Sequence, residues 1–164
     1  NEIPEEYISR NNGVMLISSG KIRQSNEGCA CTMNSILKQF IKHLTVGENE
    51  VVLLDMEAGV EHFGRGVDNS VDLILMIVDP SFESLKLTKK IQQLGDSIGK
   101  TVFFVLNKVN ELVLPTMLES IDDQSKVLAV ISTDTEIARK GLVGDELMME
   151  IPEIHMLARK ILKQ

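Results

Sequence analysis

An acid–glycine segment follows a continuous apolar run near the middle of the chain. The segment is Asp55-Met56-Glu57-Ala58-Gly59, and the run before it is Val51–Leu54. Strands that a parallel sheet buries on both faces are apolar runs of this kind, so Val51–Leu54 is predicted to be one. In phosphoryl-transfer proteins an acid at such a strand end holds Mg²⁺ near the phosphates. The segment therefore favours nucleotide chemistry, although acids and a turn glycine also end ordinary strands.

The phosphate-binding loop that normally accompanies such a segment has the pattern Gly-x-x-x-x-Gly-Lys-Ser/Thr. The 164 residues contain no copy of it. Ser19-Gly20-Lys21 follows a predicted strand, but its first glycine is absent and Ile22 replaces the Mg²⁺-binding hydroxyl. We therefore expect this chain by itself to hydrolyse no ATP.

A second candidate for nucleotide contact is Asn107-Lys108, which ends the β-branched and aromatic run Thr101–Leu106. An asparagine amide can pair with a purine edge, whereas a plain loop exit is the competing explanation. Two such motifs on successive strand–helix units favour a nucleotide site more than either does separately. Asn110 stands where a guanine-reading acid would follow the lysine, which disfavours a GTPase.

Cys29-Ala30-Cys31 is a candidate metal-binding motif at the predicted start of a helix. Free backbone N–H groups at a helix start favour the thiolate form of cysteine. Two thiolates can chelate a soft ion such as Zn²⁺, Cu⁺ or Ni²⁺. They supply half of a four-coordinate site, which a second copy in a two-fold dimer would complete. The alternative is that both cysteines are small residues that pack.

Apolar runs alternate with helical stripes along the chain. Besides Val51–Leu54, the predicted strands are Val14–Ile17, Leu73–Val78, Thr101–Leu106 and Val127–Ile131. Helical spacing runs from Met33 to Leu44, Leu87 to Ile98, Thr135 to Lys140 and Pro152 to Leu162, with a short helix from Pro115. This alternation predicts one α/β domain over residues 1–164, with a mainly parallel sheet in three layers.

Functional loops of such a fold lie at the carboxyl ends of the parallel strands. The polar and thiol residues expected to meet there are Cys29, Cys31, Asp55–Gly59, Asp79, Asn107 and Thr133-Asp134. Their position at successive strand ends predicts a ligand site at one edge of the sheet.

The amino-acid composition disfavours nucleic acids and membranes as binding partners. A net charge of −7 and an aromatic share of 4% with no Trp disfavour nucleic-acid binding, which rewards basic and stacking side chains. No apolar stretch approaches the roughly 20 residues of a membrane span. The only two cysteines, Cys29 and Cys31, are too close to form a useful disulfide loop. We therefore expect a cytoplasmic protein that binds neither nucleic acid nor membrane.

Several segments together resemble the CO dehydrogenase maturation ATPases, the CooC family, which is grouped with MinD and the nitrogenase iron protein. They are Gly28–Cys31, Asp55–Gly66, Val71-Asp72, Asp79–Ser81 and Asn107-Lys108. The stretch from Glu57 to Gly66 is long and specific, and the resemblance extends from about Ile3 to the terminal helix. It implies a P-loop NTPase-like fold of the MinD type, without the amino-terminal phosphate-loop strand and helix.

The resemblance also implies a function. The family's members are ATP-dependent homodimers that deliver nickel to carbon monoxide dehydrogenase. By this resemblance the chain is the carboxy-terminal portion of such a protein, and ATP with Mg²⁺ acts only in the full-length form. Cys29 and Cys31 of each subunit would bind Ni²⁺ or Zn²⁺ at the dimer interface.

The same resemblance assigns the nucleotide site. The catalytic Mg²⁺ and switch segment would be Asp55, Glu57 and Gly59. The adenine-binding residues would be Asn107 and Lys108, with a loop that closes over the base formed by Ser132, Thr133 and Asp134.

Two other functions and one structural consequence stay open. The chain could be an ATP-independent metal-carrying dimer, or an iron–sulfur reductase-like relative of the nitrogenase iron protein. The family's amino-terminal strand normally lies between Val51–Leu54 and Leu73–Val78. Without it, either a gap remains or these two strands pair directly, and exposed strand edges favour association.

Overall fold

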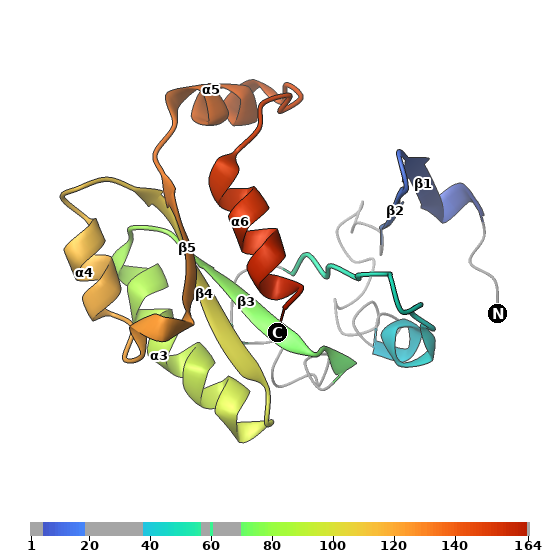
Figure 1. Cartoon of the computed structure of the whole chain (residues 1–164), viewed down its shortest axis with the longest axis horizontal. Coiled ribbons are helices and arrows are strands. Elements are labelled where there is room, and N and C mark those ends of the chain that lie inside the picture. Colours follow the sequence, from blue (N-terminus) through green and yellow to red (C-terminus); the bar gives the residue numbers. More distant parts are fainter. Residues whose placement is uncertain (1–4, 19–37, 57–59, 61–69, 164) are drawn as a thin grey trace, which may run out of the picture.

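The computed structural model describes residues 5–18, 38–56, 60 and 70–163 of the chain. Residues 38–43 are helical. The other described elements, in chain order, are η1 (Glu5–Tyr7), β1 (Ile8–Asn11), β2 (Val14–Ile17), β3 (Leu73–Val78), α3 (Phe82–Ser97), β4 (Thr101–Val109), α4 (Leu114–Glu119), η3 (Gln124–Lys126), β5 (Val127–Ser132), α5 (Thr135–Val143) and α6 (Pro152–Ile161) (Figure 1).

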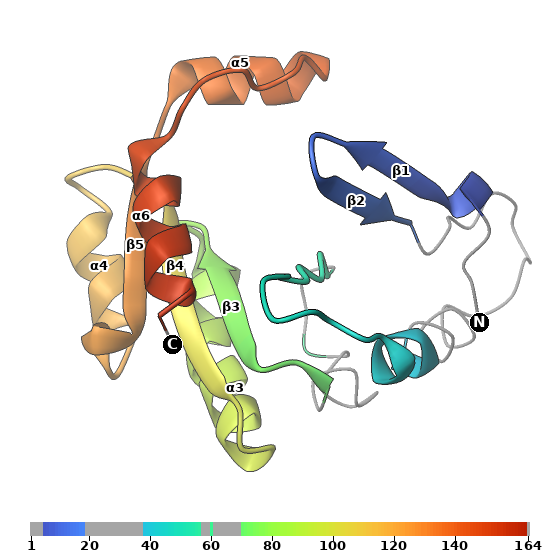
Figure 2. The same ribbon diagram turned by 45° about the vertical axis from the view of Figure 1, so that its right-hand side comes forward.

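Strands β3, β4 and β5 form a parallel sheet in that order, with β4 in the middle. The register of β3 and β4 runs from Leu73 opposite Thr101 to Val78 opposite Leu106. Helices α3 and α4 cover one face of this sheet and α6 covers the other (Figures 1 and 2). The predicted three-layer α/β fold with a parallel sheet is thus confirmed.

Side chains of β4 alternate between two apolar cores, one on each face of the sheet. Val102, Phe104 and Leu106 pack in the core that includes Ile91 of α3 and Met117 of α4. Val105 packs on the opposite face with Leu128 and Leu157, the latter from α6. Successive side chains of a strand point to opposite faces, so one continuous apolar run supplies both cores.

Local sequence signals fix the ends of the main helices. The Ser81 hydroxyl accepts a hydrogen bond from the Ser84 N–H at 3.2 Å and caps α3, which Gly99 follows at φ 67°. Pro115 and Pro152 lie in the first turns of α4 and α6, where the missing N–H costs no helical hydrogen bond. Helix α5 extends past the predicted end at Lys140 to Val143, and Gly144 caps it at φ 75°.

The run Val14–Ile17 is a strand, as predicted, but it lies outside the parallel sheet and is mostly exposed. It forms β2 of an antiparallel hairpin with β1, in which Asn11 lies opposite Val14 (Figure 2). The connecting residues Asn12 and Gly13 both have positive φ, 45° and 80°. Such an Asn-Gly pair favours a two-residue hairpin turn, so this strand pairs locally and its Val14 side chain remains 68% exposed.

The predicted strand Val51–Leu54 is also wrong. These residues have no regular secondary structure, and Leu53 is 85% exposed. Within the described residues β3 pairs with β4 alone, so Val51–Leu54 and β3 do not pair directly. A strand needs a neighbour for its backbone N–H and C=O groups, and the described part of the chain offers Val51–Leu54 none.

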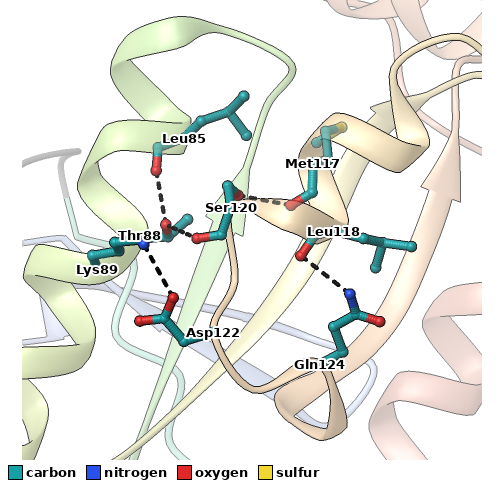
Figure 3. Close-up of polar contacts among 8 residues, drawn as sticks. All are labelled: Leu85, Thr88, Lys89, Met117, Leu118, Ser120, Asp122 and Gln124. Carbon is teal, nitrogen blue, oxygen red and sulfur yellow. Dashed lines mark hydrogen bonds and ion pairs between the residues drawn. The ribbon is translucent and has the colours of Figure 1, made fainter.

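A buried hydroxyl connects α3 to the segment that follows α4 (Figure 3). Thr88 is 1% exposed, and its Oγ1 lies 2.7 Å from the Leu85 carbonyl and 2.9 Å from the Ser120 carbonyl. A hydroxyl carries one hydrogen, so these two carbonyls share a single donor. Beside it the exposed ion pair of Lys89 with Asp122, at 3.1 Å, joins the same two segments.

Asp123 follows this ion pair and caps η3. Hydrogen bonds from the hydroxyl of Ser125, and then from its backbone N–H, hold the pKa of the Asp123 carboxyl below its ordinary value. This cap is therefore complete above the ordinary carboxyl pKa and is lost as the pH falls through the lowered one.

None of the helices in the described ranges has the length and apolarity to cross a membrane.

The first prediction concerns Gly95, where α3 approaches β4 closely. A Cβ at Gly95 would lie 2.3 Å from Cγ2 of the buried Val102. We expect Gly95→Ala to lower the free energy of unfolding by about 1–3 kcal/mol through overpacking, as measured by urea denaturation. The control is Gly141→Ala in α5, where a Cβ would meet nothing within 4 Å. Helix propensity there predicts a gain of roughly 0.5–1 kcal/mol, and equal losses in the two variants would contradict the packing argument.

The second prediction concerns the Thr88 hydroxyl. Thr88→Val keeps the shape of the side chain but leaves the Leu85 and Ser120 carbonyls without their shared donor. We expect the free energy of unfolding to fall by about 1–3 kcal/mol. The control is Ser97→Ala on the same helix, which removes an exposed hydroxyl that donates to the Leu94 carbonyl at 2.6 Å. That variant should stay within about 0.5 kcal/mol of the parent.

Candidate functional site

The carboxyl ends of β3, β4 and β5 bring together polar residues that are far apart in the sequence. Asp79 directly follows β3, and Ser132 is the last residue of β5. Asn107 and Lys108 lie near the carboxyl end of β4. The structure thus brings Asp79 and Asn107 together, as predicted, and places the Thr133-Asp134 loop at the same end of the neighbouring strand β5. Parallel register is the cause, because Val78 lies opposite Leu106 and the next residues of both strands follow as neighbours.

Asp79 is the residue around which the described part of this site is organised. Its Oδ1 accepts a hydrogen bond from Nδ2 of Asn107 at 3.0 Å, and its Oδ2 lies 2.5 Å from Nζ of Lys108. Both carboxylate oxygens thus hold partners from β4. The ion pair also neutralises a negative charge that would otherwise repel a nucleotide.

A backbone irregularity in β4 makes the second of these contacts possible. Lys108 has φ 55°, in the left-handed region that non-glycine residues rarely adopt. The register between β4 and β5 shifts between Leu106 and Val109 at the same place. Beyond the shift Val109 lies opposite Ser132, and its carbonyl accepts a hydrogen bond from the Thr133 N–H at 2.8 Å. The end of β5 is therefore fixed against the strand that carries Asn107.

Asp134 caps helix α5 in this structure. Its Oδ1 accepts hydrogen bonds from the N–H groups of Glu136, at 2.7 Å, and Ile137, at 2.9 Å. This bonding positions the loop Ser132–Asp134 that was predicted to close over a base. Sequence reasoning missed the cap, although an acid two residues before Glu136 at a helix start is its usual signal. Contact of Ser132, Thr133 or Asp134 with a base stays a prediction.

Of the residues predicted to bind phosphate or metal, the structure describes Asp55 but not Glu57, Gly59, Cys29 or Cys31. Asp55 is described and exposed, and it follows the irregular segment Val51–Leu54. Glu57, Gly59, Cys29 and Cys31 lie outside the described residues. Across the described ranges, no cluster of three or more His, Cys, Asp or Glu side chains could hold a metal ion. The Mg²⁺ role of Asp55–Gly59 and the metal role of the cysteines therefore stay predictions.

Known proteins with similar sequences indicate the family of this chain. An uncharacterized ATP-binding protein of Methanocaldococcus jannaschii is 44% identical to it over 152 residues, 93% of this chain. The carbon monoxide dehydrogenase accessory protein CooC of Rhodospirillum rubrum is 32% identical over 144 residues, 87% of this chain. The chain belongs with the CooC-like proteins. No family model matches it.

This chain spans only part of its CooC-like relatives. The alignment covers 61% of the Methanocaldococcus protein and 55% of the Rhodospirillum CooC. A second ATP-binding protein of the same archaeon is 31% identical over 140 residues, with 54% of its length covered. The resemblance to the CooC family noted from the motifs is thus confirmed. Because the chain spans little more than half of these relatives, the activity of a whole CooC-like protein is not assigned to it by similarity.

A third prediction distinguishes the cap from any ligand contact of Asp134. Asp134→Ala removes the acceptor for two N–H groups of α5, so we expect the free energy of unfolding to fall by about 1 kcal/mol. Asp134→Ser supplies another capping oxygen and should recover most of this loss. The matched control is Asp145→Ala, which removes an exposed acid 3.9 Å from Arg139 and should change stability by less than about 0.5 kcal/mol. Equal losses in Asp134→Ala and Asp134→Ser in urea denaturation would contradict the capping role.

Proposed function

We propose that this CooC-like chain is part of an ATP-dependent protein that inserts nickel into carbon monoxide dehydrogenase. The observation that carries the proposal is the sheet edge at which Asn107 lies between Asp79 and the Thr133 loop, in a chain similar to CooC. The printed name of that relative, a carbon monoxide dehydrogenase accessory protein, supports the client. The printed names of the archaeal relatives, ATP-binding proteins, support the nucleotide.

In this proposal the described sheet edge is the adenine side of the nucleotide site. Asn107 pairs with the edge of the base, and the Ser132–Asp134 loop lies beside it. Asp55, Glu57 and Gly59 form the Mg²⁺ and γ-phosphate side, where a carboxylate and a backbone N–H would sense hydrolysis. Because the 164 residues contain no Gly-x-x-x-x-Gly-Lys-Ser/Thr loop, the proposal assigns ATP hydrolysis to the full-length form.

The metal side of the proposal rests on the sequence. Cys29 and Cys31 are separated by one residue, and as thiolates both would bind a soft ion. Four thiolates from two copies of the chain would complete a tetrahedral site for a soft divalent ion. Nickel is then the cargo of a homodimer, carried by residues that ATP binding and hydrolysis bring together and separate.

The fourth prediction tests the shared thiolate site. The purified chain, incubated with Ni²⁺ or Zn²⁺ and desalted under reducing conditions, should retain about half a metal ion per chain as a dimer. Metal content is measured by elemental analysis and mass by light scattering. Cys29→Ser/Cys31→Ser should lose both the metal and the dimer, since each needs the other. The control is Ser18→Ala/Thr45→Ala, which changes two hydroxyl residues outside the motif and should lose neither.

Other outcomes of this experiment point elsewhere. A metal-free chain whose mass ignores the cysteine substitution contradicts the shared site and leaves the cysteines structural. A brown, oxygen-sensitive product with iron and sulfide favours the iron–sulfur alternative over a nickel carrier. Metal retention by a chain whose dimer delivers nickel to metal-free carbon monoxide dehydrogenase without ATP favours the ATP-independent carrier.

A further inference from the structure

Asp79 fixes which way the Asn107 side-chain amide faces. Asp79 and Asn107 continue the β3–β4 register by one residue beyond Val78 and Leu106, so their side chains lie on the same face of the sheet. An ionised carboxylate only accepts hydrogen bonds, and within an amide only the nitrogen donates. Nδ2 of Asn107 must therefore face Asp79, at 3.0 Å, and Oδ1 must face away from it.

The other bonds of Asp79 hold this arrangement in place. Its Oδ2 is 2.5 Å from Nζ of Lys108, so the carboxylate cannot rotate without losing the ion pair. Its N–H donates to Oγ of Ser84 at 3.1 Å, and its carbonyl accepts from the N–H of Ser81 at 2.7 Å. The acceptor that orients Asn107 is thus fixed through both its side chain and its backbone.

The free side of the Asn107 amide carries a carbonyl oxygen. Among the described residues, no group donates a hydrogen bond to Oδ1 of Asn107. Strand β4 separates Asp79, which follows β3, from the Ser132–Thr133 end of β5. An amide whose nitrogen is held on the β3 side therefore offers an acceptor to a ligand bound on the other side.

We propose that Asp79 is a positioning residue that makes this site select a purine with an exocyclic amine at C6. By holding Nδ2 of Asn107, it leaves Oδ1 to accept a hydrogen bond from the amine of adenine. Hypoxanthine and guanine carry a carbonyl at C6, which would place two acceptors against each other. The inference rests on the proposed nucleotide function and adds the group that sets its base selectivity.

Removing the charge at position 79 should release the Asn107 amide. Asp79→Asn keeps the shape of the side chain. The new amide can turn either its NH₂ donor or its oxygen acceptor toward Asn107, so it no longer dictates which atom of Asn107 faces position 79. Asp79→Ala removes the partner altogether. In both variants the Asn107 amide can rotate and present Nδ2 to a carbonyl at C6.

The fifth prediction is a change in base selectivity, measured on the purified 164-residue chain. AMP and IMP, which differ at C6 of the base, are titrated while backbone amide shifts are followed by NMR. We expect the parent chain to bind AMP about tenfold more tightly than IMP, and Asp79→Asn and Asp79→Ala to bind both within about twofold. The control is Asp122→Asn, which removes the negative charge that lies 3.1 Å from Nζ of Lys89 and should keep the parent ratio.

A second readout tests the orientation without a nucleotide. In the parent chain one side-chain N–H of Asn107 should exchange slowly and resonate downfield, as a proton bonded to a carboxylate does. This signature should vanish in Asp79→Ala and persist in Asp122→Asn. Unchanged backbone spectra elsewhere show that each variant is folded.

The outcomes distinguish failure of the selectivity inference from failure of the nucleotide proposal. Binding of both nucleotides with a parent ratio near one, or with a ratio that Asp79→Asn leaves unchanged, overturns the role of Asp79 and leaves the nucleotide site intact. Failure of the parent chain to bind AMP or IMP at millimolar concentration overturns the adenine role of this chain, and the selectivity inference with it. Loss of selectivity in both Asp79 variants, with the Asp122→Asn ratio retained, supports both.

Discussion

The structure depends on the pairing and packing of β4 between two neighbours and two cores. This strand hydrogen-bonds to β3 on one side and β5 on the other. Its residues Val102, Val105 and Leu106 are completely buried, and their alternation supplies apolar side chains to both helical layers. Burial of a side chain of this size contributes about 1.5–3 kcal/mol, so the central strand is strongly stabilised close to the candidate site.

The candidate site follows from the same strand. Because β3 and β4 pair in parallel register up to Val78 and Leu106, Asp79 and Asn107 emerge side by side. The shift of register toward β5 and the positive φ of Lys108 then turn one lysine back onto Asp79 and bring Thr133 against Val109. Rigid pairing below the site thus positions its polar groups, a common way of building function on a packed scaffold.

The described residues before β3 are arranged differently, because they have few neighbours within the described part of the chain. The Asn12-Gly13 turn closes a hairpin from adjacent residues, and this local pairing does not require the parallel sheet. Val51–Leu54 has the composition of a buried strand but finds no neighbour in the described part of the chain. Apolar composition alone therefore did not decide whether a run becomes a strand, since a ladder needs a second backbone at the right distance.

Over residues 73–163, apolar runs alternate with helical stripes, and this pattern was enough to predict an α/β fold with Asp79, Asn107 and Thr133 at strand ends. The sequence also determined the CooC resemblance, through motifs that are continuous in the chain. Three features could be seen only in the folded chain. Asp79 holds both Asn107 and Lys108, Asp134 caps α5, and the runs Val14–Ile17 and Val51–Leu54 stay out of the parallel sheet. The physical reason is that composition and periodicity report burial and local geometry, whereas pairing depends on register and on which strands are available as neighbours.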